Sequence, residues 1–190
     1  LDNSIGSAWG PSDDRHKAQW TKVTFSGRHQ PSGEPELQFL LTHTGEMLID
    51  DVHVSQDSPT GTNMLSNGGF EEGSRYWDIW PGTHEESRVV NTDAHSGGNS
   101  LLVVSKGHGD NWYNNIEYDV TNPRLYGNRT YHVTYWAKWQ RGNNWFYIRG
   151  HRGGLAQSYD LVHAAEIPVP DNLGTPGARN SIYEETPPPL

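Results

Sequence analysis

Cysteine is absent from the 190-residue sequence, which excludes a disulfide framework, a thiolate metal site and a cysteine nucleophile. Basic residues are also scarce, because 14 Lys and Arg stand against 23 Asp and Glu, for a net charge of -9. Nucleic-acid binding needs a clustered positive field, so this balance argues against a nucleic-acid partner. No apolar run approaches the roughly 20 residues of a membrane helix, and we expect no insertion into a membrane.

The patterns of common active sites are missing as well. The sequence has no Gly-x-Ser-x-Gly elbow, no phosphate-binding glycine loop and no His-x-x-Glu-His pattern. Its histidines are spread over separate segments, which favours surface positions over a histidine metal centre. Two adjacent acidic pairs, Glu85-Glu86 and Glu184-Glu185, give no sign of the opposed carboxylates that glycoside hydrolysis requires. We therefore expect no enzyme activity.

Turn-forming and aromatic residues, by contrast, are plentiful. The chain has 21 Gly, 12 Pro, 8 Trp and 9 Tyr, whereas hydrophobic residues make up only 33%. Many turns between short strands are typical of an all-β domain, and no long segment has the 3.6-residue apolar period of a helix. This composition predicts a modest core and a surface that presents aromatic rings.

Alternating apolar and polar residues predict strands over most of the chain. The expected strands lie near residues 20–25, 36–42, 47–54, 63–71, 77–80, 87–90, 101–104, 116–120, 131–139 and 145–151. The continuous apolar character of 101–104 predicts a buried strand. Alternation is lost from residue 155, and the last residues are rich in Pro and Gly. We expect an irregular lead-in (1–17), one β-sandwich module (18–166) and a linker or tail (167–190).

Several motifs resemble one known family. The stretch NMLSNGGFE (63–71), then Trp77, the turn HSGGNSL (95–101) and the strand YHVTYWAK (131–138) are similar to the first half of carbohydrate-binding modules of the family 4/9/16/22 superfamily. The strands at 20–25, 36–41 and 45–54, the last with the sequence Ile-Asp-Asp-Val, resemble the second half. The resemblance implies a galactose-binding-like jelly roll that binds polysaccharide or oligosaccharide without catalysis.

The two halves stand in the reverse of the family order. Two explanations are open: the chain spans parts of two tandem modules, or it is one circularly permuted jelly roll. The resemblance implies that the first and last strands of the family module lie side by side and antiparallel, so the eight residues 55–62 would suffice to join them as a hairpin loop. The termini of such domains are often close together, which makes permutation tolerable. We favour the permuted jelly-roll β-sandwich.

The resemblance also implies a structural calcium ion, Ca2+. Family modules hold it with the Glu of the Gly-x-Phe-Glu pattern, an Asp of the last strand and nearby backbone oxygens, which suits the oxygen-rich coordination of calcium. The implied ligands in this sequence are Asp50, Asp51, Asn67, Gly69, Glu71, Ser96 and Asn99. Because consecutive strand residues point to opposite faces, we expect only one of the two Asp residues to join Glu71. The alternative is that these carboxylates are solvated edge charges.

Aromatic side chains with polar neighbours are the candidates for sugar contact. Sugars present apolar C–H faces and hydroxyl edges, so their sites combine flat rings with hydrogen-bonding groups. The candidates are Asn111, Trp112 and Tyr113 in a polar loop, Tyr147, Arg149 and His151 alternating along one strand, and Trp136, which would lie beside that strand. The alternative is that most tryptophans fill the core.

These expectations describe a monomeric, non-catalytic carbohydrate-binding module of a larger extracellular or cell-surface bacterial protein. The first residue, Leu1, and the Pro-rich end are expected for a segment cut from a longer chain. One rival is a structural or adhesion module with the same fold and no sugar site. A second is a jelly-roll polysaccharide lyase or hydrolase, which would need a cleft with a His/Tyr/Arg set or two facing carboxylates. Exposed aromatic rings would favour sugar binding, and buried rings would favour the structural module.

Overall fold

Ten β-strands make up the regular structure in the part of the chain that the computed structural model describes. The described residues are 19–29, 36–41, 43–107, 116–119, 126, 128–142, 145–150 and 156–160. The strands are β1 (Thr21–Arg28), β2 (Glu36–Leu41), β3 (Gly45–Gln56), β4 (Trp77–Ile79), β5 (Arg88–Val90), β6 (Ser100–Ser105), β7 (Ile116–Asp119), β8 (Thr130–Gly142), β9 (Trp145–Gly150) and β10 (Ala156–Asp160). Among these residues, no helix has the length and apolar character needed to cross a membrane.

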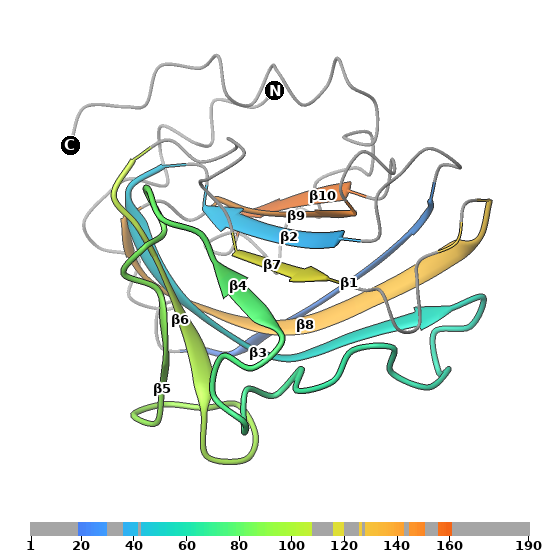
Figure 1. Cartoon of the computed structure of the whole chain (residues 1–190), viewed down its shortest axis with the longest axis horizontal. Coiled ribbons are helices and arrows are strands. Elements are labelled where there is room, and N and C mark those ends of the chain that lie inside the picture. The colour runs from blue at the N-terminus through green and yellow to red at the C-terminus, as the bar shows by residue number, and fades with distance from the viewer. Residues whose placement is uncertain are drawn as a thin grey trace.

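The strands form two five-stranded antiparallel sheets that pack face to face (Figure 1). Sheet A has the order β1-β8-β3-β6-β5, and sheet B has the order β10-β9-β2-β7-β4. The arrangement confirms the predicted all-β sandwich. Strand β6 lies between β3 and β5, as its apolar sequence predicted, whereas β10 was not predicted because Ala-Gln-Ser-Tyr-Asp has little apolar alternation.

Strand β8 illustrates how the sequence pattern builds the sandwich. Its odd-numbered residues from Tyr131 to Ala137 are fully buried, while His132 and Thr134 on the other side are half-buried. This is the two-residue period of a strand with one face on the core. The inner faces of the two sheets meet through aromatic rings, with the Phe39 centroid 6.4 Å from that of Tyr135.

The stretch 63–71, predicted as a strand, is not one. It runs beside β3 as an irregular segment, with the Met64 N–H donating to the Val54 carbonyl oxygen at 2.7 Å. The Asn63 side chain replaces part of the backbone ladder, because its amide donates to the Val52 carbonyl and its oxygen accepts from the Val54 N–H. Gly68 is required here, since a Cβ at this position would lie 2.1 Å from the Val52 carbonyl oxygen.

The three strands that precede residue 62 are distributed over the two sheets, with β1 and β3 in sheet A and β2 in sheet B. Strand β1 pairs with β8, β2 lies between β9 and β7, and β3 lies between β8 and β6. The β3–β8 pair makes the most extensive register of the molecule, from Gly45 opposite Gly142 to Gln56 opposite Tyr131. These early strands therefore share one core with the later ones.

Candidate functional site

The candidate residues that the structure describes divide between the two sheets. Trp136 lies on β8 in sheet A, whereas Tyr147 and Arg149 lie on β9 in sheet B. The prediction that Trp136 lies beside Tyr147 and Arg149 is therefore wrong. Although β8 and β9 follow each other in the sequence, they belong to different sheets, which a strand pattern alone does not reveal.

On the outer face of sheet A, a loop covers one side of the Trp136 ring. The imidazole of His95 stacks on this indole with ring centroids 3.7 Å apart and planes at 15°. Trp20 meets the same imidazole edge-on at 5.9 Å and donates its indole N–H to Asp93 at 3.1 Å. Asp93 also accepts a bond from Lys138 Nζ at 2.5 Å. The loop is thus fixed to β1 and β8 through rings and an ion pair.

The side chain of Asp50 anchors the same loop from below. Its carboxylate is fully buried, and Oδ2 accepts the backbone N–H groups of His95 at 2.9 Å and Ser96 at 3.1 Å. Oδ1 accepts the N–H of Asp51 at 2.7 Å. Burial raises the pKa of Asp50, the nearby charge of Asp51 adds to this, and the backbone hydrogen bonds oppose it.

Asp51 reaches the same loop, which corrects the expectation that only one of the two Asp residues points to this side. A β-bulge interrupts the register between Asp50 and His53, and Asp51 has a left-handed φ of 50°. The alternation of strand side chains is lost at this point. Asp51 therefore accepts bonds from the His95 ring at 2.6 Å and the Ser96 hydroxyl at 2.6 Å.

Glu71 holds the far end of the loop. Its Oε1 accepts the N–H groups of Gly98 at 2.9 Å and Asn99 at 3.0 Å, and these bonds lower the pKa of Glu71. Gly97 has a φ of 62°, and a Cβ there would lie 2.3 Å from Glu71 Oε1, so the turn needs glycine. We call Asp50, Asp51, Glu71 and the loop 95–99 that they bind the carboxylate clamp.

The clamp has the oxygen-rich chemistry of a calcium site, with one difference from the expected ligand set. Gly69 lies beside it, since a Cβ there would be 3.7 Å from Asp51 Oδ1 and 3.8 Å from Asp50 Oδ1. The loop, however, offers these carboxylates its N–H groups, and the Asn67 carbonyl accepts the Trp77 indole N–H at 3.0 Å. The described residues contain no group of three or more Asp, Glu or His side chains placed as metal ligands. The set fits calcium only where backbone carbonyls complete the coordination.

The outer face of sheet B carries a transverse row of polar residues. Gln38 of β2 pairs with Arg149 of β9 on one side and with Glu117 of β7 on the other, and Glu117 pairs with Asp78 of β4. We call Arg149, Gln38, Glu117 and Asp78 the sheet-B row. Gln38 donates to Glu117 Oε2 at 3.3 Å and to Glu36 Oε2 at 3.4 Å. In register the row crosses β9, β2, β7 and β4, and the bond between Gln38 and Glu117 joins β2 to β7.

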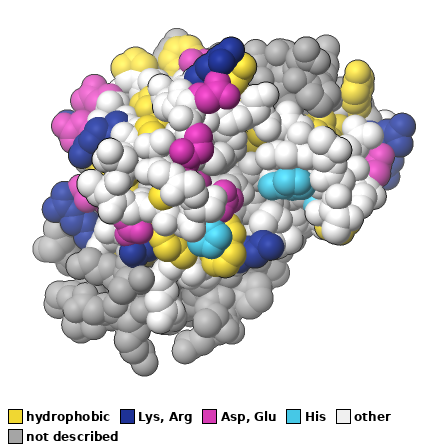
Figure 2. Space-filling model, turned by 90° about the horizontal axis from the view of Figure 1, so that it is seen from below, with side chains coloured by type: hydrophobic (Ala, Val, Ile, Leu, Met, Phe, Trp, Pro, Cys, Tyr) yellow, Lys and Arg dark blue, Asp and Glu magenta, His cyan; other side chains and the backbone are white. Residues whose placement is uncertain are grey.

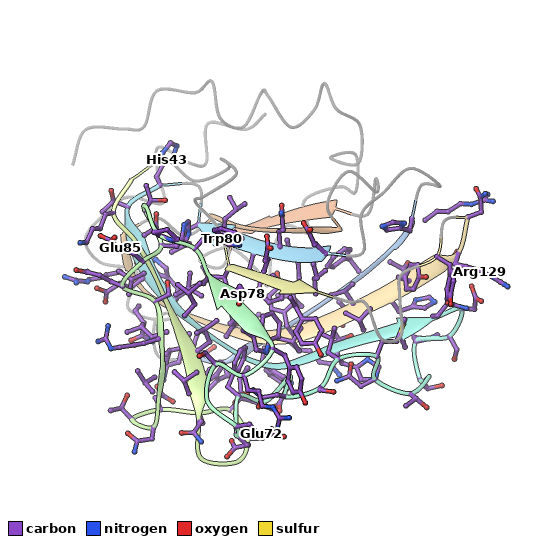
Figure 3. All side chains as sticks on the ribbon, viewed as in Figure 1. His43, Glu72, Asp78, Trp80, Glu85 and Arg129 are labelled. Carbon is purple, nitrogen blue, oxygen red and sulfur yellow. The ribbon has the colours of Figure 1, made fainter. Side chains whose placement is uncertain are left out.

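Access to the row is greatest at its β4 end. Gln38 is buried, Glu117 is half-buried, and Asp78 is exposed beside the half-buried Trp80 (Figure 3). Burial raises the pKa of Glu117, and the negative charge of Glu36 adds to this, while the Trp80 indole and the Gln38 amide act in the opposite direction. Perturbed carboxylates of this kind are common at binding and catalytic sites.

Not all predicted sugar-contact residues can be placed. Asn111, Trp112, Tyr113 and His151 lie outside the described residues. For Tyr147 and Arg149 the backbone is described, and their register partners are Leu40 and Gln38.

More than half of the chain, residues 62–171, matches the model of the carbohydrate binding domain family CBM 4/9. The chain belongs to this family. No curated protein and no solved structure matched the sequence. The family match begins after β3, so β1, β2 and β3 of this carbohydrate-binding domain precede the matched segment.

Sequence reasoning missed part of the sheet-B row of this domain. Glu36, Gln38 and Glu117 alternate with core residues, so the sequence signalled that they face away from the core. What the sequence did not supply was the strand order that places β2 beside β7 and β7 beside β4. Trp80 was not among the predicted sugar-contact residues, and it is half-buried next to the edge strand β4.

Proposed function

We propose that this carbohydrate-binding domain holds a polysaccharide or oligosaccharide non-catalytically on the outer face of sheet B. The observation that carries the proposal is the sheet-B row, a line of hydrogen-bonding side chains across neighbouring strands with an indole at its accessible end. Trp80 supplies an apolar surface for sugar C–H groups, while Glu117 and Asp78 accept bonds from hydroxyls. On β9, the backbone positions of Tyr147 and Arg149 lie in register with Leu40 and Gln38, beside the row.

The absence of catalysis in the proposal rests on how the carboxylates are arranged. Glu117 and Asp78 are register partners on neighbouring strands, and Glu36 is connected to Glu117 through Gln38. A glycosidase needs two carboxyl groups on opposite sides of the scissile bond. Side-by-side carboxylates on one sheet face suit hydroxyl binding better than acid–base attack.

The wider setting is proposed from the family and the composition. A chain without cysteine and with a net charge of -9 is compatible with an exported module. We place it as a monomeric module of an extracellular or cell-surface bacterial protein, where it tethers a larger chain to glycan. The single permuted sandwich is part of the same proposal, supported by the position of β3 between β8 and β6.

Affinity electrophoresis over a panel of soluble polysaccharides tests the sugar site. We expect the full chain to be retarded in at least one gel, and Trp80→Ala and Glu117→Gln to lose that retardation. Trp112→Ala tests the loop that the sequence singled out. Glu85→Gln is the matched control, because Glu85 is an exposed carboxylate paired with Lys106 on another part of the surface. Absence of retardation on every glycan would leave the structural module as the better assignment.

We further propose that the carboxylate clamp binds one calcium ion as a stabilising group. Support comes from the negative charges of Asp50 and Glu71, each of which interacts electrostatically with Asp51. A ligand that binds only the folded state at 100 times its Kd adds about 2.7 kcal/mol of stability. We expect calcium to raise the Tm, a chelator to lower it, and Glu71→Gln to abolish the difference. An unchanged Tm after chelation would contradict the calcium proposal and leave the clamp as a purely hydrogen-bonded anchor.

A further inference from the structure

A hollow of about 430 Å³ opens on the outer face of sheet A, between β1, β3, β8 and the segment 59–69. Figure 2 looks onto the molecule from below, the side on which β3 and β8 lie in Figure 1. The volume falls within the range of about 300–1,000 Å³ that is typical of small-molecule sites. Gly68 and Gly69 line the hollow, and a Cβ at Gly68 would collide with the Val52 carbonyl. This part of its wall is therefore backbone, whose shape depends on glycine.

One side of the hollow is an indole that is already fixed in place. Trp136 lines it, whereas His95, which stacks on that ring at 3.7 Å, does not. The hollow therefore meets Trp136 at a part of its side chain that His95 does not cover. His95 is itself held by Asp51 at 2.6 Å, so the ring needs little ordering when a ligand binds.

The remaining walls supply both hydrogen-bond donors and acceptors. Asp51 offers a carboxylate whose orientation is set by the Ser96 hydroxyl and the His95 ring. Lys22 contributes an exposed ammonium from β1, and His53 contributes an imidazole with Nε2 3.1 Å from the Gly61 carbonyl oxygen. A flat ring flanked by a fixed acceptor and a mobile donor matches a polyhydroxylated ring compound.

We propose that this hollow is a second saccharide site, for a single neutral pyranose unit of a glycan chain. The sugar ring would stack on Trp136. One of its hydroxyls would donate a hydrogen bond to the Asp51 carboxylate, and another would accept a hydrogen bond from the Lys22 ammonium. The charges favour a neutral sugar, because Asp51 repels an anionic sugar and Lys22 repels a cationic one. The choice of a saccharide rests on the proposed function, but the site is independent of the sheet-B row.

Two sites on opposite outer faces would make the domain bivalent. The hollow belongs to sheet A and the sheet-B row to sheet B, so one chain segment cannot occupy both without passing around the sandwich. The domain would then bridge two glycan segments, and the second contact would gain from a high effective concentration.

The indole N–H signals of the full-length, 15N-labelled protein test this site directly. The probes are cellotetraose, xylotetraose, laminaritetraose and mannotetraose, each titrated with calcium and again with a chelator. Trp136→Phe and Trp80→Phe assign the two indole signals. We expect at least one tetrasaccharide to shift the Trp136 signal, and a sugar bound on sheet B to shift the Trp80 signal.

Variants that fill the hollow separate it from the sheet-B row. Thr134→Arg places a bulky side chain in the hollow while Trp136 stays intact, and we expect at least tenfold weaker binding as followed by the Trp136 signal. Ser26→Arg is the matched control, because it lies on the exposed side of β1 and does not line the hollow. It should leave binding unchanged.

The outcomes distinguish the second saccharide site from the proposed sugar binding on sheet B. A shift of Trp80 without a shift of Trp136 overturns the second site and leaves the proposed function standing. A shift of Trp136 that Thr134→Arg abolishes supports the second site, even where Trp80 stays unmoved and the sheet-B assignment fails. No shift of either signal with any of the four sugars overturns both.

Discussion

The carboxylate clamp and the sheet-B row use the same kind of side chain for different ends. In the clamp, Asp50 and Glu71 accept backbone N–H groups at 2.7–3.1 Å, so each bond also fixes the path of the chain. In the sheet-B row, Gln38 bonds Glu36 and Glu117 at 3.3–3.4 Å, side chain to side chain. Long bonds between side chains are easily exchanged for bonds to a ligand. The clamp therefore secures the fold, whereas the row can rearrange around a sugar.

The largest effect is expected from removing the part of the clamp that lies on β3, which is Asp50 and Asp51. A chain that begins at residue 62 keeps the family match but loses β1 and β3 from sheet A and β2 from sheet B. We expect it to lack a cooperative unfolding transition in circular dichroism, while a chain of residues 19–190 retains one. Cooperative folding of the shorter chain would contradict the single permuted sandwich.

The next test concerns Asp50 alone. Asp50→Ala removes a fully buried carboxylate and leaves the partly buried N–H groups of Asp51, His95 and Ser96 without their acceptor. Unpaired buried donors cost about 1–3 kcal/mol each, and partial access to water lowers the sum, so we expect a loss of about 3 kcal/mol in denaturant unfolding. The matched change in the sheet-B row is Asp78→Ala, at an exposed position, which should stay within about 0.5 kcal/mol. Equal losses at the two positions would erase the distinction between clamp and row.

A smaller effect is expected from Glu117 and pH. Its folded pKa is raised above the reference value of 4.5, first by burial and then by Glu36. The folded state therefore binds the proton more tightly than the unfolded state, and this contribution to stability is lost as pH rises through the raised pKa. Glu117→Gln should remove this pH-dependent contribution to stability. As the pH rises above 4.5, the Tm of the variant should therefore fall less than the Tm of the unchanged protein. Parallel Tm–pH curves would show that Glu117 titrates alike in both states.

The sequence predicted the parts of the fold that depend on alternation. Tyr131, Val133 and Tyr135 were assigned to one face of their strand, and all three are fully buried. The prediction failed where the backbone leaves the strand conformation. The bulge with left-handed Asp51 reverses the expected side of its carboxylate, and the side chain of Asn63 substitutes for a strand in the family motif.

The candidate sites depended on strand order, which alternation does not encode. Gln38 and Glu117 are 79 residues apart in the chain, and only the pairing of β2 with β7 brings them to 3.3 Å. Trp136 and Tyr147 are close in sequence, yet they lie in different sheets. Separation in the sequence was a poor guide to whether the residues of either pair lie close together, because a sandwich pairs strands that are far apart in the chain.

The pairing of β1 with β8 also sets when this domain is able to fold. The hydroxyls of Thr24 and Thr134, which are 110 residues apart, meet at 3.3 Å across these strands. Closing so long a loop costs chain entropy before the contact contributes any stability, and pairings of this kind slow folding. During synthesis, β1 must therefore wait without a partner until β8 has left the ribosome, whereas β2 and β3 can pair earlier with β7 and β6 but still lack their neighbours β9 and β8. We expect the exposed apolar face of β3 to need protection from aggregation over that interval.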